Sequence, residues 1–175
     1  MTVKPGDVGF AHTHGAMGAL IRLGSWLRLH KGEWNHMFIV SDEVDVDGMP
    51  LIIQATLRGV TGDARLDKVA PGGKYATMTI PFGTDRVEVL RFAKAQIGMR
   101  YGLLTILAIA IDVVTWSFVP AFRGARKPSW ICSALACESL RFGGWLHNWV
   151  DCYNMFPQEA YDALVVTRFV VESTP

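Results

Sequence analysis

The residue of greatest chemical interest is Cys132, which stands at the start of an apolar stretch with helical character. Pro128 disfavours helix before it, and Ser129 is of a type that often caps a helix N-terminus. With Ser129 as the cap, Cys132 falls in the first helical turn, where free N–H groups and the helix dipole favour an anion. Such a setting promotes ionisation of a thiol, so Cys132 is a candidate nucleophile.

A cysteine nucleophile requires a base, and His36 is the best placed of the 5 histidines. It lies in 35–41, which alternates and is rich in β-forming residues, and a strand holds an imidazole more rigidly than a loop does. Gln54 interrupts the apolar run of the next predicted strand, and its amide oxygen could accept a proton from the imidazole. The alternatives are a partly exposed strand-end histidine and a glutamine that faces solvent.

The composition limits the class of protein. The chain has 175 residues, of which 50% are hydrophobic and 19% charged, and its net charge is +1. This predicts a single domain over 1–175 with a real core, and it excludes a disordered chain and a strongly basic nucleic-acid-binding protein. The 3 cysteines do not suggest a disulfide framework. The first ten residues lack the apolar core of a signal peptide, so we expect a cytoplasmic protein.

The predicted elements that position these side chains are mainly strands in the first part of the chain, then helices, then a closing strand. Strands are predicted over 7–11, 35–41, 50–57, 74–80 and 164–171, and helices over 16–29, 84–97, 101–118, 130–142 and, for a turn or two, 157–163. Thr84 is the expected cap of the second helix, and 41–48 forms a hairpin turn. The order predicts an α+β fold, with a small antiparallel sheet packed against helices.

The apolar segment 103–119 is a candidate for membrane contact. Asp112 interrupts the segment and Pro120 ends it, whereas a spanning helix requires roughly 20 apolar residues. A buried helix or a hydrophobic lid is the preferred interpretation, and contact with a membrane surface through 103–119 is the alternative. The basic loop 123–127 follows, and its positive charges could attract an acidic substrate or anionic head groups.

Other motifs have simpler interpretations. The acidic run 43–48 resembles half of a calcium loop, but Gln54 stands where a bidentate glutamate is required, so a solvated turn is preferred. His12 and His14 could supply two zinc ligands, yet the cysteines lack the paired spacing of a zinc site. We therefore expect no metal and no cofactor, with both histidines in a loop beside the active site. Cys137 is expected to be a small core residue.

Five short motifs occur in an order that resembles a known family. They are Gly6-Asp7-Val8-Gly9-Phe10, Asn35-His36-Met37-Phe38-Ile39-Val40, Ile53-Gln54-Ala55, Gly98-Met99-Arg100-Tyr101 and Cys132-Ser133-Ala134-Leu135. The chain resembles the circularly permuted branch of the NlpC/P60 papain-like superfamily, the YiiX-like and YaeF-like group, over roughly 6–140. This resemblance implies a permuted papain-like fold in which the histidine precedes the cysteine, the reverse of papain.

The resemblance also implies the roles of the site residues. Cys132 would be the nucleophile, His36 the base and Gln54 the third member, where the family often has glutamate. The family also often has Cys-Ser-Glu where this chain has Cys132-Ser133-Ala134. This difference indicates that the residues around the substrate site differ. Tyr101 would line the substrate site, and a core tyrosine is its alternative interpretation.

Together these features predict a thiol hydrolase or acyltransferase. It would cleave an amide or ester bond through an acyl-enzyme, in a peptide, cell-wall or lipid-linked acyl substrate. The alternative is a catalytically weak or inactive binding module of the same fold, near a membrane, and the glutamine at position 54 is its main support. A membrane-associated structural protein is a third possibility. No nucleic-acid partner is expected, and the sequence does not indicate an oligomeric state.

Overall fold

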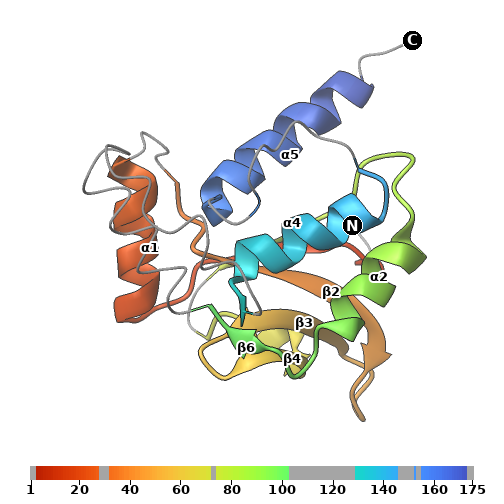
Figure 1. The fold of residues 1–175 in the computed structure, drawn as a ribbon, viewed down its shortest axis with the longest axis horizontal. Coiled ribbons are helices and arrows are strands. Elements are labelled where there is room, and N and C mark those ends of the chain that lie inside the picture. Colours follow the sequence, from red (N-terminus) through yellow and green to blue (C-terminus); the bar gives the residue numbers. More distant parts are fainter. Residues whose placement is uncertain are drawn as a thin grey trace.

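The structure is a computed structural model that describes residues 3–27, 32–71, 74–102, 129–145, 152 and 155–172. Its described part is an α+β fold with one five-stranded antiparallel sheet and four α-helices (Figure 1). The elements are β1 (Val8–Ala11), α1 (Ala16–Leu27), β2 (His36–Val44), β3 (Pro50–Thr56), β4 (Gly59–Arg65), the 3₁₀ turn η1 (Leu66–Lys68), β5 (Tyr75–Met78), α2 (Arg86–Ala95), β6 (Arg100–Tyr101), β7 (Ser129–Trp130), α4 (Cys132–Phe142) and α5 (Pro157–Glu172).

The sheet has the strand order β4-β3-β2-β1-β5, and every pair in it is antiparallel. β2 lies at its centre, where Ala11 of β1 pairs with His36 and Ile53 of β3 pairs with Ile39. The acidic turn joins β2 to β3: the Asp45 carboxylate accepts the backbone N–H of Met49 at 2.8 Å. The central strand is thus paired on both sides, and its first residue, His36, is paired with β1.

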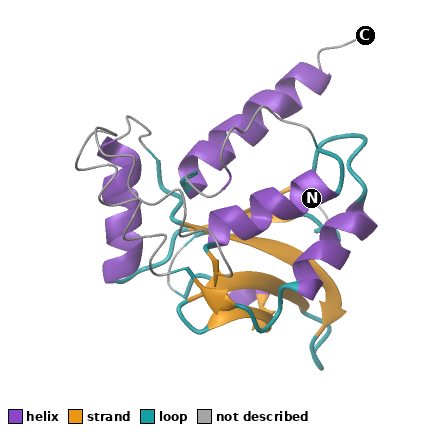
Figure 2. Ribbon diagram, in the orientation of Figure 1, coloured by secondary structure: helices purple, strands orange, loops and turns teal. Residues whose placement is uncertain are grey.

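α2, α4 and α5 lie on one side of the sheet, and α1 lies beside them (Figure 2). α2 and α4 contact β2, and α5 contacts α4. The alternation of β2 divides its side chains between two layers, since successive strand residues point to opposite faces. Met37 and Ile39 join the core beneath α4, whereas Phe38 and Val40 join a second cluster that includes Leu66 of η1. The central strand is therefore buried on both faces.

α4 is buried over most of its length, and it begins at Cys132 with Ile131 as its N-cap residue. The prediction that Ser129 caps the helix is wrong, because Ser129–Trp130 is a short strand that pairs in parallel with β6. The buried Trp130 ring donates from Nε1 to Gln96 Oε1 at 3.0 Å. Pairing with β6 and the burial of Trp130 thus keep the backbone of β7 extended, so α4 starts only at Cys132.

The C-terminal prediction is also wrong, because the expected strand 164–171 is the second half of α5. The β-branched residues of that run favoured a strand. Glu159, however, accepts the backbone N–H of Phe156 at 2.9 Å, the reach-back half of a capping box. Ala160 and Leu164, one turn apart, are buried in the core. The start signal and this spacing carry the helix through 157–172.

Two further differences lie in the middle of the chain. β4 was not expected, because Gly59, Gly62 and charged residues hide its alternation. The cap of α2 is Asp85 and not Thr84, since the Asp85 carboxylate accepts the N–H groups of Val87 and Glu88. The 3₁₀ turn η1 was not expected either. The remaining strands and α-helices that begin before residue 100 lie where the sequence places them, with ends shifted by a few residues.

Part of the predicted chain course falls outside the described residues. Tyr101, the expected first residue of a helix, lies in β6. The helix expected over 101–118 lies outside the described residues from residue 103 onward, and so does the whole basic loop 123–127. Within the described ranges, no helix combines the length and the hydropathy that crossing a bilayer requires.

A disulfide joins Cys137 of α4 to Cys152, with their Cα atoms 5.6 Å apart. This corrects two expectations, that the cysteines form no disulfide and that Cys137 is a simple core residue. The spacing of 15 residues carries no sequence signal of its own, and the pairing follows from the fold, which returns the chain to α4 before α5 begins. Cys132 is the free cysteine of the chain.

Candidate active site

The Cys132 thiol lies buried at the N-terminus of α4. The first N–H groups of a helix have no partner within it, and the helix dipole adds a partial positive charge there. The backbone N–H groups of Ser133 and of Met37 on β2 donate to the sulfur. The helix and the central strand therefore both present donors to the same atom.

The His36 side chain connects the thiol to Gln54. Its Nε2 donates to Gln54 Oε1 at 2.7 Å, and the ring also makes a hydrogen bond with the Cys132 side chain. Since Nε2 is occupied, Nδ1 is the ring nitrogen left for the sulfur. The pairing of Ile39 with Ile53 makes His36 and Gln54 diagonal neighbours on one face of the sheet. The three residues predicted from the sequence thus form one hydrogen-bonded chain.

The pKa shifts of Cys132 and His36 favour a thiolate–imidazolium pair. Burial alone would raise the pKa of Cys132, but the hydrogen bond and positive charge of His36, with the two backbone donors, hold that pKa below its ordinary value. Burial alone would lower the pKa of His36, but the hydrogen bond and charge of Cys132, with the bond to Gln54, raise it above its ordinary value. The opposite shifts keep a nucleophilic sulfur and a proton-carrying ring together.

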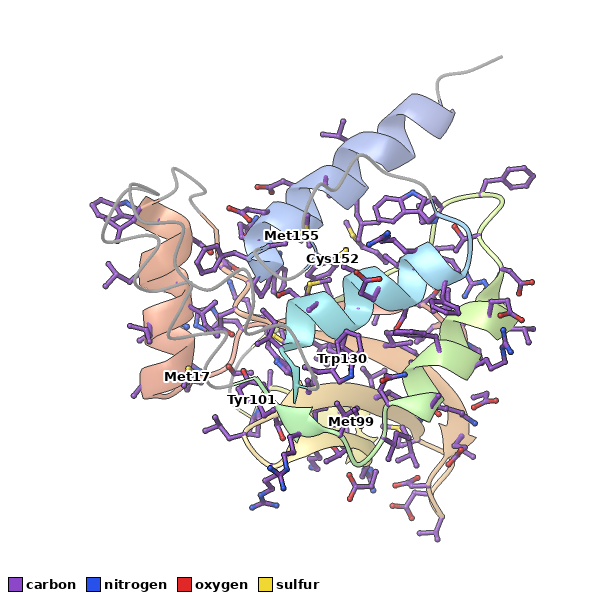
Figure 3. All side chains as sticks on the ribbon, in the orientation of Figure 1. Met17, Met99, Tyr101, Trp130, Cys152 and Met155 are labelled. Carbon is purple, nitrogen blue, oxygen red and sulfur yellow. A yellow bond between two sulfur atoms is a disulfide. The ribbon has the colours of Figure 1, made fainter. Side chains whose placement is uncertain are left out.

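Tyr101 lies beside this pair. It belongs to β6, where it pairs with Trp130 of β7, two residues before the nucleophile (Figure 3). Burial, and then the negative charge of Cys132, raise the pKa of the Tyr101 phenol far above its ordinary value. The phenol therefore keeps its proton and is available as a hydrogen-bond donor close to the sulfur.

The sequence interpretation missed Asn35, which fastens the loop after β1 to the start of β2. Asn35 is 1% exposed, and its side-chain oxygen accepts from Thr13 N at 2.8 Å, while its Nδ2 donates to Thr13 O at 2.8 Å. These bonds fix the residue next to His36. An amide residue directly before a buried strand was the available signal, because a buried polar side chain requires partners.

The structure also places the residues of the alternative sites. The His12 and His14 rings lie 5.3 Å apart in the loop after β1, and His12 directly follows the residue paired with His36. Within the described ranges, no group of three or more histidine, cysteine or acidic side chains could hold a metal ion. The acidic turn is neutralised by Arg65, whose Nη1 lies 2.8 Å from Asp45 and 2.7 Å from Asp47.

Comparisons with known proteins bear on the fold alone. No protein-family model matches the sequence, and no curated protein matches it. Among solved structures, the chain is similar to the crystal structure of the metalloprotein YiiX from Escherichia coli O157:H7, described as DUF1105, with a TM-score of 0.51 and 15% identity. The match covers 78% of this chain and 63% of that one. The chain therefore has a fold similar to YiiX and spans under two thirds of that protein's length.

Proposed function

We propose that this protein is a cysteine hydrolase or acyltransferase with a permuted papain-like fold of the NlpC/P60 type, acting on an amide or ester bond. The observation that supports it most is the continuous chain of hydrogen bonds from Cys132 through His36 to Gln54, with opposite pKa shifts on the first two. A buried structural cysteine has no need of a buried, protonated imidazole beside it, whereas a nucleophile does.

The proposed reaction begins when the Cys132 thiolate attacks a carbonyl carbon and forms a C–S bond. The carbonyl oxygen gains the negative charge, which the N–H groups at the start of α4 and the Tyr101 hydroxyl would stabilise. As the intermediate collapses, His36 gives its proton to the leaving nitrogen or oxygen. Water, or another acceptor, then loses a proton to His36, attacks the thioester and releases the thiolate.

No step of this proposal uses a metal. The structure similar in fold is described as a metalloprotein. In the described part of this chain, however, His12 and His14 come without a third histidine, cysteine or acidic ligand. The described residues do not form a metal centre, and the proposal assigns the chemistry to Cys132 and His36.

The proposal is tested by trapping the acyl-enzyme. Purified protein is incubated with p-nitrophenyl esters of short and long acyl chains and with acylated peptide amides, then acid-quenched and mapped by mass spectrometry. We expect a burst of leaving group and an acyl group on Cys132, with Cys132→Ser as the blank. Rapid alkylation of Cys132 without acylation by any member of the panel would contradict the proposal and favour the binding module.

Gln54 gives a second test, because it separates an enzyme from an inactive module. Gln54→Ala should slow acylation about fivefold, since it removes one hydrogen bond worth about 1 kcal/mol that orients the imidazole. Gln54→Glu should restore or exceed the rate of the native protein, since a carboxylate stabilises the imidazolium more than an amide does.

The matched control for these variants is Thr56→Ala, two residues along the same strand, which should leave the acylation rate unchanged. Equal rates for Gln54→Ala and the native protein would show that Gln54 does not orient His36. Rates are read from the burst phase at several pH values, because a change in His36 orientation and a change in its pKa then separate.

A further inference from the structure

The outward face of α1 is apolar. Leu20, Leu23, Trp26 and Leu27 are exposed by 47%, 52%, 57% and 43%. Their spacing places them on one stripe of the helix, because residues three, four and seven apart share a face. Figure 1 shows α1 at one side of the molecule, apart from the sheet. This stripe is a continuous apolar surface that the described fold leaves open.

The face of α1 turned toward the protein carries its smallest residues, with Met17 and Ile21 partly buried beside them. Gly18 and Ser25 are its buried residues. A Cβ at Gly18 would lie 2.6 Å from Asn35 Nδ2, and one at Gly24 would lie 2.7 Å from the Phe156 ring. The glycines thus allow the helix to pack closely on the body of the protein. An ordinary surface helix exposes polar residues, whereas the most exposed face of α1 is apolar.

The sequence through this helix carries charge of one sign. Residues 8–32 contain no aspartate or glutamate, and their basic residues are Arg22, Arg28 and Lys31. An apolar helix in a basic stretch of sequence complements a surface of anionic head groups. With 12 residues, α1 is about 18 Å long, which is too short to cross a hydrocarbon core of about 30 Å. An in-plane position suits its length, and Trp26 suits the interface between water and acyl chains.

We propose that α1 binds an anionic lipid surface, with the stripe formed by Leu20, Leu23, Trp26 and Leu27 buried in the interface. This orientation would bring the candidate active site to the lipid surface. Only four residues separate the end of β1, where Ala11 pairs with His36, from the start of α1. The bonds between Asn35 and Thr13 fasten that connection. The proposal does not depend on the proposed reaction.

The test is flotation of the full chain with vesicles of phosphatidylglycerol and phosphatidylcholine. The double variant Leu23→Glu/Trp26→Glu should float at least about tenfold less than the native protein, because two large apolar side chains leave the interface and two charges repel the head groups. The control is Val166→Glu on α5, a residue 61% exposed, which should float like the native protein. Raised salt or pure phosphatidylcholine should weaken flotation.

Three results would overturn the proposal. One is a native chain that stays in the aqueous fraction with every vesicle composition. Another is a double variant that floats as well as the native chain. The third is a native dimer that the double variant converts to a monomer, because the stripe would then bind a second copy. Equal melting temperatures of the double variant and the Val166→Glu control show that the substitutions act at the surface, and an acylation assay without vesicles reports separately on the proposed reaction.

Discussion

Replacing His36 with alanine is expected to slow alkylation of Cys132 by iodoacetamide at pH 6.5 by about a hundredfold or more. Burial is the largest influence on this thiol, and it raises the pKa; the hydrogen bond and charge of His36 are what hold the pKa below its ordinary value. Without the ring, only the backbone donors of Met37 and Ser133 oppose the larger effect of burial, and the pKa of Cys132 moves above the ordinary value of a thiol. A thiol whose pKa lies two units above the pH is only about 1% ionised.

The sign of the pH dependence follows from the same directions. In the native protein the thiolate persists as the pH falls, until the pH passes below the lowered pKa of Cys132. The rate of alkylation should therefore be almost flat from mildly alkaline to mildly acidic pH. In His36→Ala the rate should rise continuously with pH up to the alkaline range, because the neutral thiol predominates below its raised pKa.

The matched control is His14→Ala, which removes an exposed imidazole from the neighbouring loop. Its alkylation profile should follow that of the native protein. Because Cys137 and Cys152 are joined in a disulfide, the label reports on Cys132 alone. A native profile that rises steeply above pH 8, with no loss of rate in His36→Ala, would contradict the ion pair and with it the nucleophile.

The grouping of the candidate site residues could be predicted from the sequence more fully than the fold around them. Cys132 stands at the start of a helical stretch, His36 opens a predicted strand, and Gln54 interrupts an apolar strand, where a polar side chain requires a partner. The structure brings these three residues together. Met37 could not be found in the same way, because it contributes a backbone N–H, and a backbone donor leaves no signature in the residue type.

The fold predictions failed where tertiary contacts decide against local preference. The residues of α5 after Leu164 favour a strand by type, and the helix continues because its first turns are already packed on the core. Ser129 has the right type for a cap, but strand pairing with β6 holds its backbone extended. β4 carries glycines and charges that hide alternation, and it forms because β3 offers it an edge. In each case two local structures compete, and contacts with neighbouring elements decide which one forms.

The disulfide carries the second large prediction, which concerns stability. Reducing the Cys137–Cys152 bond should lower the free energy of unfolding by about 3 kcal/mol, the entropic cost of closing a loop of 15 residues in the unfolded chain. For a chain of this size the melting temperature should fall by about 6–12 °C. The measurement is thermal unfolding with and without a phosphine reductant, in a Cys132→Ser background that removes the free thiol.

The double variant Cys137→Ala/Cys152→Ala is the control, because its melting temperature should not respond to the reductant. An equal shift in the control would mean that the reductant acts elsewhere, and no shift in the Cys132→Ser protein would mean that the bond does not form. The bond leaves α4 one and a half turns after the nucleophile, so it restrains the helix that presents the sulfur to His36. Reduction should therefore also weaken the preference of Cys132 for alkylation at acidic pH, below the temperature at which the reduced protein unfolds.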